Sequence, residues 1–306
     1  MSSSIRKVAI VGIQASGGLG HLVIDQLLKS SIQVTAVTRD APKTKASLKA
    51  APNLNLIQGD YTSAASLAPC LRGHDAVVSL ILRGQPDPQI LVIDATIIAD
   101  VPHMITSSFG IDLQQEYLRT LPPFKGKVQM GDYVAQKASE GLITFNSIQT
   151  GIFFGWGLSL GMMINLKDDG LPSVLFDAGE TKFSVSAEED IATAVAVALG
   201  KKDKLPMNCS LFIHTAAVSQ NQLREYAKES RPEREFPVTL VDTAKEEKKA
   251  WEAYNNGERD ISKMGGLMSR GTFGLGLGLF KHLDSDVLGI EERDEEWLKA
   301  FIARYM

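Results

Sequence analysis

The sequence predicts an α/β fold, in which a doubly wound parallel sheet is joined to a smaller C-terminal α/β lobe. Apolar runs of strand length alternate with segments of helical period through the first half of the 306-residue chain, a pattern typical of a parallel sheet covered by helices. A glycine-rich stretch separates the first apolar run from the first helical segment. We therefore expect a Rossmann-like domain over residues 1–155 and a substrate-binding lobe over residues 156–306, with some of the chain returning to the first domain.

Six apolar runs are the expected strands, because each is short, apolar and bounded by polar, glycine or proline residues. They are residues 7–12, 32–39, 53–59, 75–82, 102–108 and 143–149. The segments between them have helical spacing and room for two or more turns. They are residues 20–30, 63–73, 88–101 and 124–141. This order of strands and helices predicts parallel neighbours joined by crossover helices.

The second half is less regular but contains three expected helices. In the first, residues 186–200, Ser186 and Glu189 have capping-box spacing and Gly200 is a suitable end. The second is residues 219–230, and the third is the strongly charged, solvated segment 242–260. The segment 264–280 has too many glycines for a stable helix and too many apolar residues for a solvated loop. It is either a mobile lid over an apolar substrate or a segment packed against the second lobe.

Composition narrows the classes of partner. A formal net charge of -4 and a pI near 5.8 argue against nucleic-acid binding, which needs a concentrated basic face, and favour a small-molecule substrate. The two cysteines lie far apart and the five histidines have no metal-ligand spacing, so we expect no metal. The chain shows no apolar run long enough to cross a bilayer and no signal-peptide pattern. We expect a cytoplasmic monomer or homodimer that does not bind membranes.

The stretch "VGIQASGGLG", residues 11–20, has glycines at the strand-to-helix turn. Such a turn exposes helix N–H groups to a pyrophosphate, and glycine is needed wherever a Cβ would obstruct it. Gly17 and Gly20 keep the GxxG spacing, whereas Gln14 stands where the first glycine of GxxGxxG would be; if Gly12 replaces it, the turn is two residues longer. Tight packing alone would also explain such a turn. The expected cofactor contacts of the turn are Gly12, Gln14, Ser16, Gly17, Gly18, Leu19 and Gly20.

The end of the second strand indicates which dinucleotide would bind. An acidic residue there suits the ribose 2′-hydroxyl of NAD, whereas a cation suits the 2′-phosphate of NADP. Here Arg39 occupies the position, followed by Lys43 and Lys45, although Asp40 adjoins it. The pattern favours NADP(H), with Arg39 and Lys45 as ligands, over an ordinary polar strand end.

These motifs, with "IQGDYTSAASLAPCLRGHDAVVSLI", "VPHMITSSFGID", "FKGK", "TGIFFGWGL" and "AVSQNQL", resemble the NmrA-like, isoflavone-reductase-like branch of the atypical short-chain dehydrogenases, most closely its fungal members. The resemblance runs from the first strand to the last helix. It implies an NADPH-dependent reductase acting on a small aromatic or polyketide-like secondary metabolite. In the family pattern an acid stands at the position of Ser108, so the role of that carboxylate does not carry over.

The resemblance also implies a catalytic lysine in an F-x-x-K element, matched by Phe124 and Lys127. In the family this lysine contacts the nicotinamide ribose and in some members takes part in proton transfer. The rival is "YVAQK", Tyr133 to Lys137, which has the Y-x-x-x-K spacing of ordinary short-chain dehydrogenases. Only "ASEGLI" separates Lys137 from Thr144, which places this pair near the helix end and away from a nicotinamide. We therefore assign catalysis and a ribose contact to Lys127, against the alternative of a solvent-facing lysine.

Further positions are expected to line the same cleft. The additional cofactor contacts are Asp60, Tyr61, Ser79, Leu80, Ile81, Ser107, Thr150 and Phe153. The expected substrate contacts are Ser108, Phe109, Phe154 and Trp156, although aromatic residues in such a run can equally belong to the core.

Two other functions remain open at this point. The family also contains proteins that bind the dinucleotide without turning it over and act as redox-sensing regulators. The altered glycine turn and Ser108 are compatible with such a sensor, whereas the intact "FKGK" favours an enzyme. A non-redox isomerase, dehydratase or cyclase on the same scaffold is the third possibility.

Overall fold

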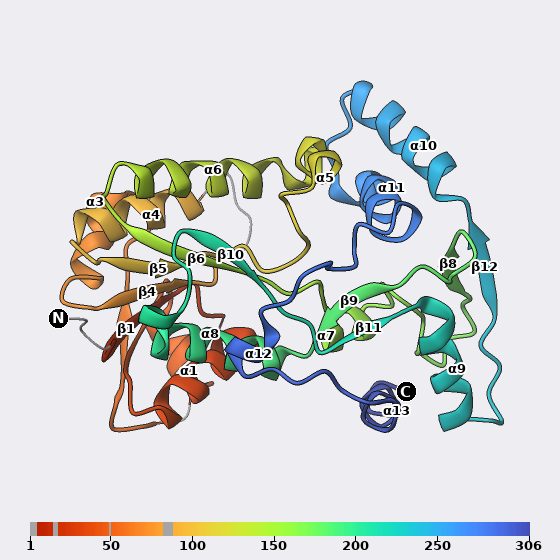
Figure 1. Cartoon of the computed structure of the whole chain (residues 1–306), viewed down its shortest axis with the longest axis horizontal. Helices are drawn as coiled ribbons and strands as arrows, with labels where there is room; N and C mark the ends of the chain where they lie inside the picture. Colours follow the sequence, from red (N-terminus) through yellow and green to blue (C-terminus); the bar gives the residue numbers. More distant parts are fainter. Residues whose placement is uncertain (1–4, 15–17, 49, 82–87) are drawn as a thin grey trace.

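Seven parallel strands form the central sheet of the computed structural model, which describes residues 5–14, 18–48, 50–81 and 88–306 (Figure 1). The strand order is β3-β2-β1-β4-β5-β6-β10. The strands are β1 (Lys7–Val11), β2 (Gln33–Thr38), β3 (Leu54–Gln58), β4 (Ala76–Ser79), β5 (His103–Ile105), β6 (Thr144–Gln149) and β10 (Cys209–Phe212). The direction of winding reverses between β1 and β4, and in such sheets ligands bind beyond the carboxyl ends at this reversal. The doubly wound, Rossmann-like fold is confirmed.

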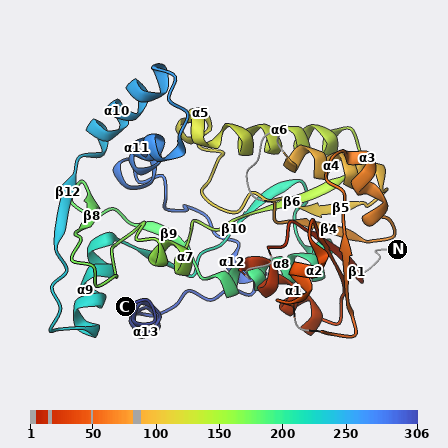
Figure 2. The same ribbon diagram turned by 180° about the vertical axis from the view of Figure 1, so that it is seen from behind.

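Helices cover both faces of this sheet (Figures 1 and 2). One face carries α3 (Ala64–Leu67), α4 (Pro88–Ile98) and α6 (Lys125–Ser139), and the other carries α1 (Leu19–Lys29) and α8 (Glu188–Gly200). Each face buries its own apolar cluster, with Val8 and Ile10 of β1 on the α1 side and Ala9 and Val11 on the α4 side. This two-sided burial explains why the strands are continuous apolar runs. Shorter helices of this lobe are α2 (Ala41–Lys45) and α5 (Glu116–Thr120), with 3₁₀ turns at 68–70 and 122–124.

The second lobe contains two small sheets and several helices. One sheet has the order β11-β9-β7, and the other pairs β12 with β8. The strands are β7 (Ile152–Phe153), β8 (Ser173–Phe176), β9 (Phe183–Ser186), β11 (Ala216–Val218) and β12 (Val238–Val241). The helices are α7 (Phe154–Ser159), α9 (Gln220–Ser230), α10 (Thr243–Asn255), α11 (Gly265–Ser269), α12 (Ser285–Leu288) and α13 (Glu295–Ala303), with 3₁₀ turns at 202–204 and 261–264 and a π-helical turn at 270–274.

The six expected strands of the first half are all present, although β4 and β5 are shorter than the runs that predicted them. The seventh strand, β10, comes from the second half and pairs with β6, while α8 packs on α1. The proposed boundary between residues 155 and 156 stays a prediction. Among the described residues, no helix combines the length and apolar character needed to cross a membrane.

The capping box expected at Ser186 is wrong. Helix α8 begins after Ala187, and Ser186 is still the last residue of β9. Its hydroxyl donates to the Thr150 carbonyl at 2.7 Å, so it joins β9 to the end of β6 instead of capping the helix. The expected helix end at Gly200 and the expected helix over residues 219–230 are confirmed. Ser219 is the N-cap of α9, and its hydroxyl accepts from Gln222 N at 3.2 Å.

The expectation that 264–280 is too rich in glycine for helix is also wrong for its first part, which forms helical turns through residue 274. The glycines permit close packing. A Cβ on Gly266 would lie 2.3 Å from Glu246 O, and one on Gly271 would lie 2.5 Å from the Leu118 side chain. Tertiary packing therefore overrides the low helix propensity of glycine, and favours the packed alternative over a mobile lid.

Gly151 allows β6 to pass close to β9. Its φ is +64°, and an added Cβ would lie 2.1 Å from Ser184 O. We expect Gly151→Ala to lower the free energy of unfolding by at least about 2 kcal/mol more than Gly73→Ala. Gly73 is a matched control because its φ is +75° but its Cβ would meet no atom within 4 Å. Urea unfolding of both variants measures the difference, and equal losses would contradict this account of the contact between the sheets.

Candidate functional site

The glycine turn lies at the reversal of the sheet, where β1 and β4 come into close contact. Gly12 has a φ of +92°, and a Cβ there would lie 2.7 Å from Ile81 N. Only glycine fits this position. The next residue, Ile13, is buried, whereas Gln14 is exposed. Gly12 and Gln14 therefore lie at the expected edge.

Helix α1 begins at Leu19, directly after the turn. Gly18 is its N-cap with a φ of +90°, and within the described residues no side chain caps this helix end. Side-chain oxygens cap α2, α3, α9, α10 and α13, whereas over the described ranges α5, α6, α7, α8, α11 and α12 share the lack of a side-chain cap with α1. A Cβ on Gly20 would make ordinary van der Waals contacts with Leu80 and Ile13 at 3.5–3.6 Å, so the packing of α1 does not itself require glycine at this position. Ser16 and Gly17 lie outside the described residues.

At the end of β2, Arg39 is exposed while its acidic neighbour is engaged elsewhere. Asp40 Oδ1 accepts from Lys43 N at 3.0 Å and caps α2. The carboxylate that could have bound a ribose 2′-hydroxyl thus has a structural partner, and the exposed guanidinium remains at the strand end. Lys45 is exposed in the last turn of α2. This arrangement suits a phosphate better than a hydroxyl.

Tyr61 and Asp60 follow β3 on the same edge. The Tyr61 hydroxyl donates to Val37 O at 2.9 Å, which fixes the ring against β2. Burial raises the pKa of Tyr61 far above its usual value, and the charge of Arg39 acts in the opposite direction. Asp60 is exposed and accepts from Thr62 N at 2.9 Å, a bond that lowers the pKa of its carboxyl.

The end of β4 contributes a buried polar atom. Ser79, Leu80 and Ile81 are all buried, and the Leu80 N–H donates to Val11 O at 2.8 Å. The Ser79 hydroxyl has no hydrogen-bond partner in the part of the chain that the structure describes. A buried hydroxyl without a partner is costly, so an acceptor or donor supplied by a ligand would stabilise it.

The loop that follows β5 connects three neighbouring elements. Thr106 Oγ1 lies 2.6 Å from Ser147 Oγ of β6, and Ser107 Oγ donates to Ile81 O at 2.9 Å. The N–H groups of Thr150 and Gly151 both donate to Gly110 O at 2.9 Å. We call residues 106–111 the bridging loop, because it joins the end of β4 to the end of β6.

Lys127 reaches this bridging loop from the first turn of α6. Its half-buried side chain donates from Nζ to the Phe109 carbonyl. A Cβ on Gly110 would lie 3.4 Å from the same Nζ. The structure therefore brings Lys127 together with Ser107, Ser108, Phe109 and the end of β4.

The rival Tyr133–Lys137 pair lies elsewhere on α6. Tyr133 donates to Asp94 Oδ1 of α4 at 2.6 Å, and this bond raises the pKa of its phenol to about 12. Lys137 Nζ lies 2.9 Å from Glu140 Oε2. Tyr133 is therefore engaged with α4 and Lys137 with the end of its own helix, which favours Lys127 over this pair as the catalytic candidate.

The aromatic residues that were expected to contact the nicotinamide or the substrate differ in their burial and in the clusters to which they belong. Phe153 is half-buried, whereas Phe154 is fully buried and stacks on Phe301 with ring centroids 4.8 Å apart. Trp156 is 55% exposed. Phe109 is buried in the cluster that contains Leu80 and Ile148. Phe153 and Phe109 lie near the sheet edge, while Phe154 belongs to the core of the second lobe.

Sequence reasoning missed Gln149, the last residue of β6. Its side chain is buried and contacts Ser108. A glutamine that ends an apolar strand was the available signal, but its partner lies about 40 residues earlier in a loop. The described residues contain no group of three His, Cys, Asp or Glu side chains arranged to hold a metal ion.

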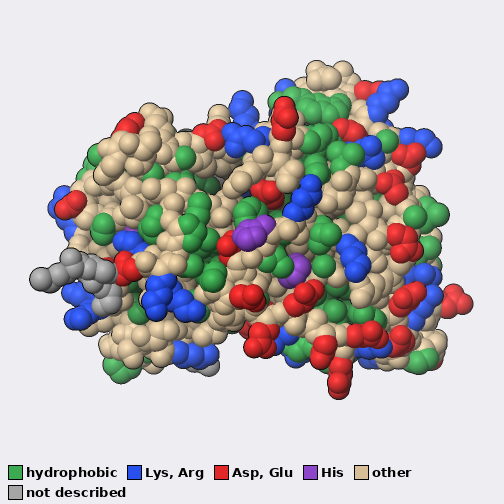
Figure 3. Space-filling view, in the orientation of Figure 1, with side chains coloured by type: hydrophobic (Ala, Val, Ile, Leu, Met, Phe, Trp, Pro, Cys, Tyr) green, Lys and Arg blue, Asp and Glu red, His purple; other side chains and the backbone are tan. Residues whose placement is uncertain are grey.

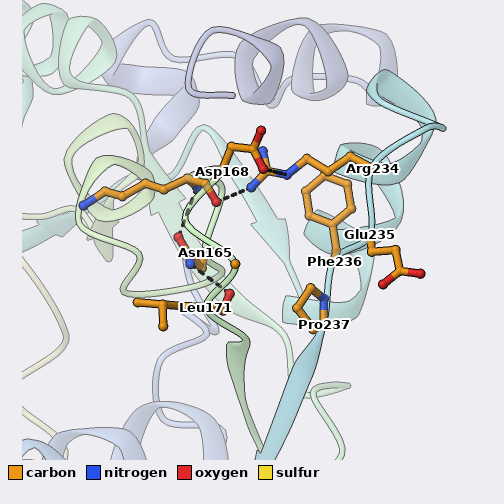
Figure 4. Close-up of a pocket in the computed structure, with 9 residues that line it drawn as sticks. Asn165, Asp168, Leu171, Arg234, Glu235, Phe236 and Pro237 are labelled. Carbon is orange, nitrogen blue, oxygen red and sulfur yellow. Dashed lines mark hydrogen bonds and ion pairs between the residues drawn. The ribbon is translucent and has the colours of Figure 1, made fainter.

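A small pocket in the second lobe does not belong to this site. It lies between residues 165–171 and 234–237 (Figure 4) and holds about 30 Å³, roughly the space of one water molecule. Arg234 fills its wall by donating to Leu166 O at 2.8 Å and by stacking over Phe236 at 4.8 Å. Arg234 thus joins residues 165–171 to residues 234–237.

The surface of the second lobe is acidic over its lower part in Figure 3. The segment leading into α13 contributes exposed Glu291, Glu292, Asp294, Glu295 and Glu296. Such a surface repels phosphate backbones.

Comparison with known proteins agrees with this geometry. Residues 15–145 match the family model described as NAD(P)H-binding. Oxidoreductase aprR of Aspergillus flavus is 26% identical over 254 residues, 82% of this chain and 82% of that protein. An isoflavone reductase homologue of Zea mays is 27% identical over 233 residues, 73% of this chain and 74% of that protein.

Over most of its length the chain is thus similar to oxidoreductases and to isoflavone reductase homologues. The solved structure of AtPrR2 with NADP+ and (+)-pinoresinol superposes with a TM-score of 0.74 at 17% identity, covering 98% of this chain and 100% of that one. This likeness supports the fold. The NAD(P)H-binding model and the oxidoreductases among the relatives identify the chain as an NAD(P)H-binding oxidoreductase.

Arg39 gives a direct test of the expected 2′-phosphate contact. We expect Arg39→Ala to weaken NADPH binding by about 10- to 100-fold, the loss of one charge-assisted contact. NADH, which lacks the phosphate, is the matched control ligand, and its affinity should change less than about threefold. Titration calorimetry measures both ligands, and equal losses for NADPH and NADH would contradict the contact.

Proposed function

We propose that the chain is an NADPH-dependent reductase of a small aromatic or polyketide-like molecule, with Lys127 as its catalytic residue. The observation that carries the proposal is the bond from Lys127 Nζ to Phe109 O at the carboxyl edge of the sheet. This bond puts a cationic proton donor beside the ends of β4, β5 and β6. These strand ends lie next to the reversal, where a parallel sheet binds its dinucleotide.

The residues present fit NADPH. The start of α1, which no side chain caps among the residues that the structure describes, would offer backbone N–H groups to a pyrophosphate, and Arg39 would bind the 2′-phosphate. The unpartnered Ser79 hydroxyl lies where β4 ends, between the glycine turn and the bridging loop. NADPH, when bound, supplies a hydride from its nicotinamide ring.

Lys127 would supply the proton that balances the hydride. Its Nζ donates to the Phe109 carbonyl oxygen at the sheet edge. From there the ammonium can donate to the substrate atom on which negative charge develops. Hydride and proton together complete a two-electron reduction.

The substrate class rests on the relatives and on the aromatic side chains. Relatives include an isoflavone reductase homologue, and the AtPrR2 structure contains (+)-pinoresinol. In this chain, half-buried Phe153 follows β6 and can cover a flat ring. We place the protein in the cytoplasm, where its two free cysteines, Cys70 and Cys209, stay reduced.

Lys127→Met tests the catalytic assignment. With NADPH, turnover of an isoflavone, (+)-pinoresinol and a naphthoquinone is followed by loss of reduced-nicotinamide absorbance. For whichever compound the native chain reduces, we expect the variant to lose about 10²- to 10⁴-fold in kcat because the proton donor is gone. The Kd for NADPH should change much less.

Lys137→Met, on the same helix, is the control and should retain kcat. An active Lys127→Met variant would remove Lys127 from the mechanism. NADPH binding without turnover of any compound would favour a redox-sensing regulator. Product formation without NADPH would identify a non-redox enzyme.

A further inference from the structure

Gln149 makes three hydrogen bonds to the bridging loop when its carboxamide is oriented so that both ends are satisfied. Its nitrogen then donates to Ile111 O at 3.0 Å and to Ser108 O at 3.1 Å, and its oxygen accepts from Ser108 Oγ at 3.1 Å. The residue is 3% exposed. A buried carboxamide with both ends engaged fixes the backbone that it contacts.

The three bonds bracket the carbonyl that holds Lys127. Phe109 lies between Ser108 and Ile111, and its oxygen accepts from Lys127 Nζ. The adjacent Gly110 has a φ of +144° and therefore depends on its neighbours for a defined conformation. Gln149 therefore holds the loop on both sides of the carbonyl.

Ser108 and Gln149 have complementary hydrogen-bonding groups in this orientation. The hydroxyl of Ser108 donates to the Gln149 oxygen. An ionised carboxylate at position 108, as in the family pattern, could only accept, so it could not make this bond. The serine in place of the acid is thus matched by a glutamine on the neighbouring strand.

We propose that Gln149 is a positioning residue for Lys127, acting through the bridging loop with Ser108 as its partner. The inference rests on the proposed function only where it assigns catalysis to Lys127. The geometric claim is that the carboxamide holds Phe109 O in place for Nζ. Loss of the carboxamide should free the loop and release the amine.

The test measures the reactivity of the Lys127 amine, which needs neither cofactor nor substrate. Native chain and Gln149→Leu are labelled with trace acetic anhydride, and each lysine is quantified by peptide mass spectrometry. Lys137, on the same helix, is the internal reference. We expect the Lys127 to Lys137 labelling ratio to rise about tenfold in Gln149→Leu, because the amine loses a charge-assisted hydrogen bond.

Gln220→Leu is the matched control variant. Gln220 is another buried glutamine with three bonds to backbone, in the second lobe, to Phe176 N, Met163 O and Val174 O at 2.6–2.8 Å. Its removal costs a similar number of buried bonds but should leave the Lys127 ratio unchanged. An equal rise in both variants would show general loosening and overturn the proposal.

If circular dichroism shows that Gln149→Leu does not fold, Ser108→Ala tests the positioning of Lys127 instead. It removes only the hydroxyl bond, and we expect the Lys127 ratio to rise by about two- to fivefold. An unchanged ratio in the folded variants would overturn the proposal. Because the labelling does not depend on turnover, failure here is distinguishable from an inactive or unaffected Lys127→Met variant, which concerns the proposed function.

Discussion

The bridging loop is the constraint on which the site depends. Its hydrogen bonds run to the Ile81 carbonyl after β4, to Ser147 and Gln149 of β6, and to Lys127 of α6. Three elements that are distant in sequence thus share one short segment of backbone. A displacement of this loop would move the lysine relative to the strand ends where the dinucleotide is expected.

The same loop connects the two lobes. Gly110 O accepts from the N–H groups of Thr150 and Gly151, where β6 passes into the second lobe. Ser186 at the end of β9 donates to Thr150 O, and Gly151 lies directly against Ser184. The elements that would hold the substrate are therefore attached to the elements that would hold the cofactor through residues 150 and 151.

The sequence predicted the sheet well because its strands are buried on both faces and read as uninterrupted apolar runs. It did not show β10, whose four residues "CSLF" give too short a run, or the helical turns at 265–274, where close packing outweighs the propensity of glycine. Ser186 had the right spacing for a cap but lies in a strand. Local sequence patterns therefore gave the wrong secondary structure where contacts between residues distant in the sequence determine the conformation.

Some residues of the candidate site could be predicted from local sequence, and others could not because their role depends on distant contacts. Gly12 and Arg39 follow from general rules for strand ends, and both lie at the edge of the sheet. Lys127 came from the family resemblance, and the short distance in sequence from Lys137 to the sixth strand argued against the rival pair. Gln149 could not be found, because its importance comes from a loop that precedes it by about 40 residues.

A crystal structure of the chain with bound NADPH is the most direct test of the proposed cofactor site and of its position relative to Lys127. We expect the pyrophosphate at the start of α1 and the 2′-phosphate within hydrogen-bond distance of Arg39. The nicotinamide ring should lie beside Lys127 Nζ and the Ser79 hydroxyl. A dinucleotide bound away from the reversal between β1 and β4, or a nicotinamide remote from Lys127, would contradict the proposed site.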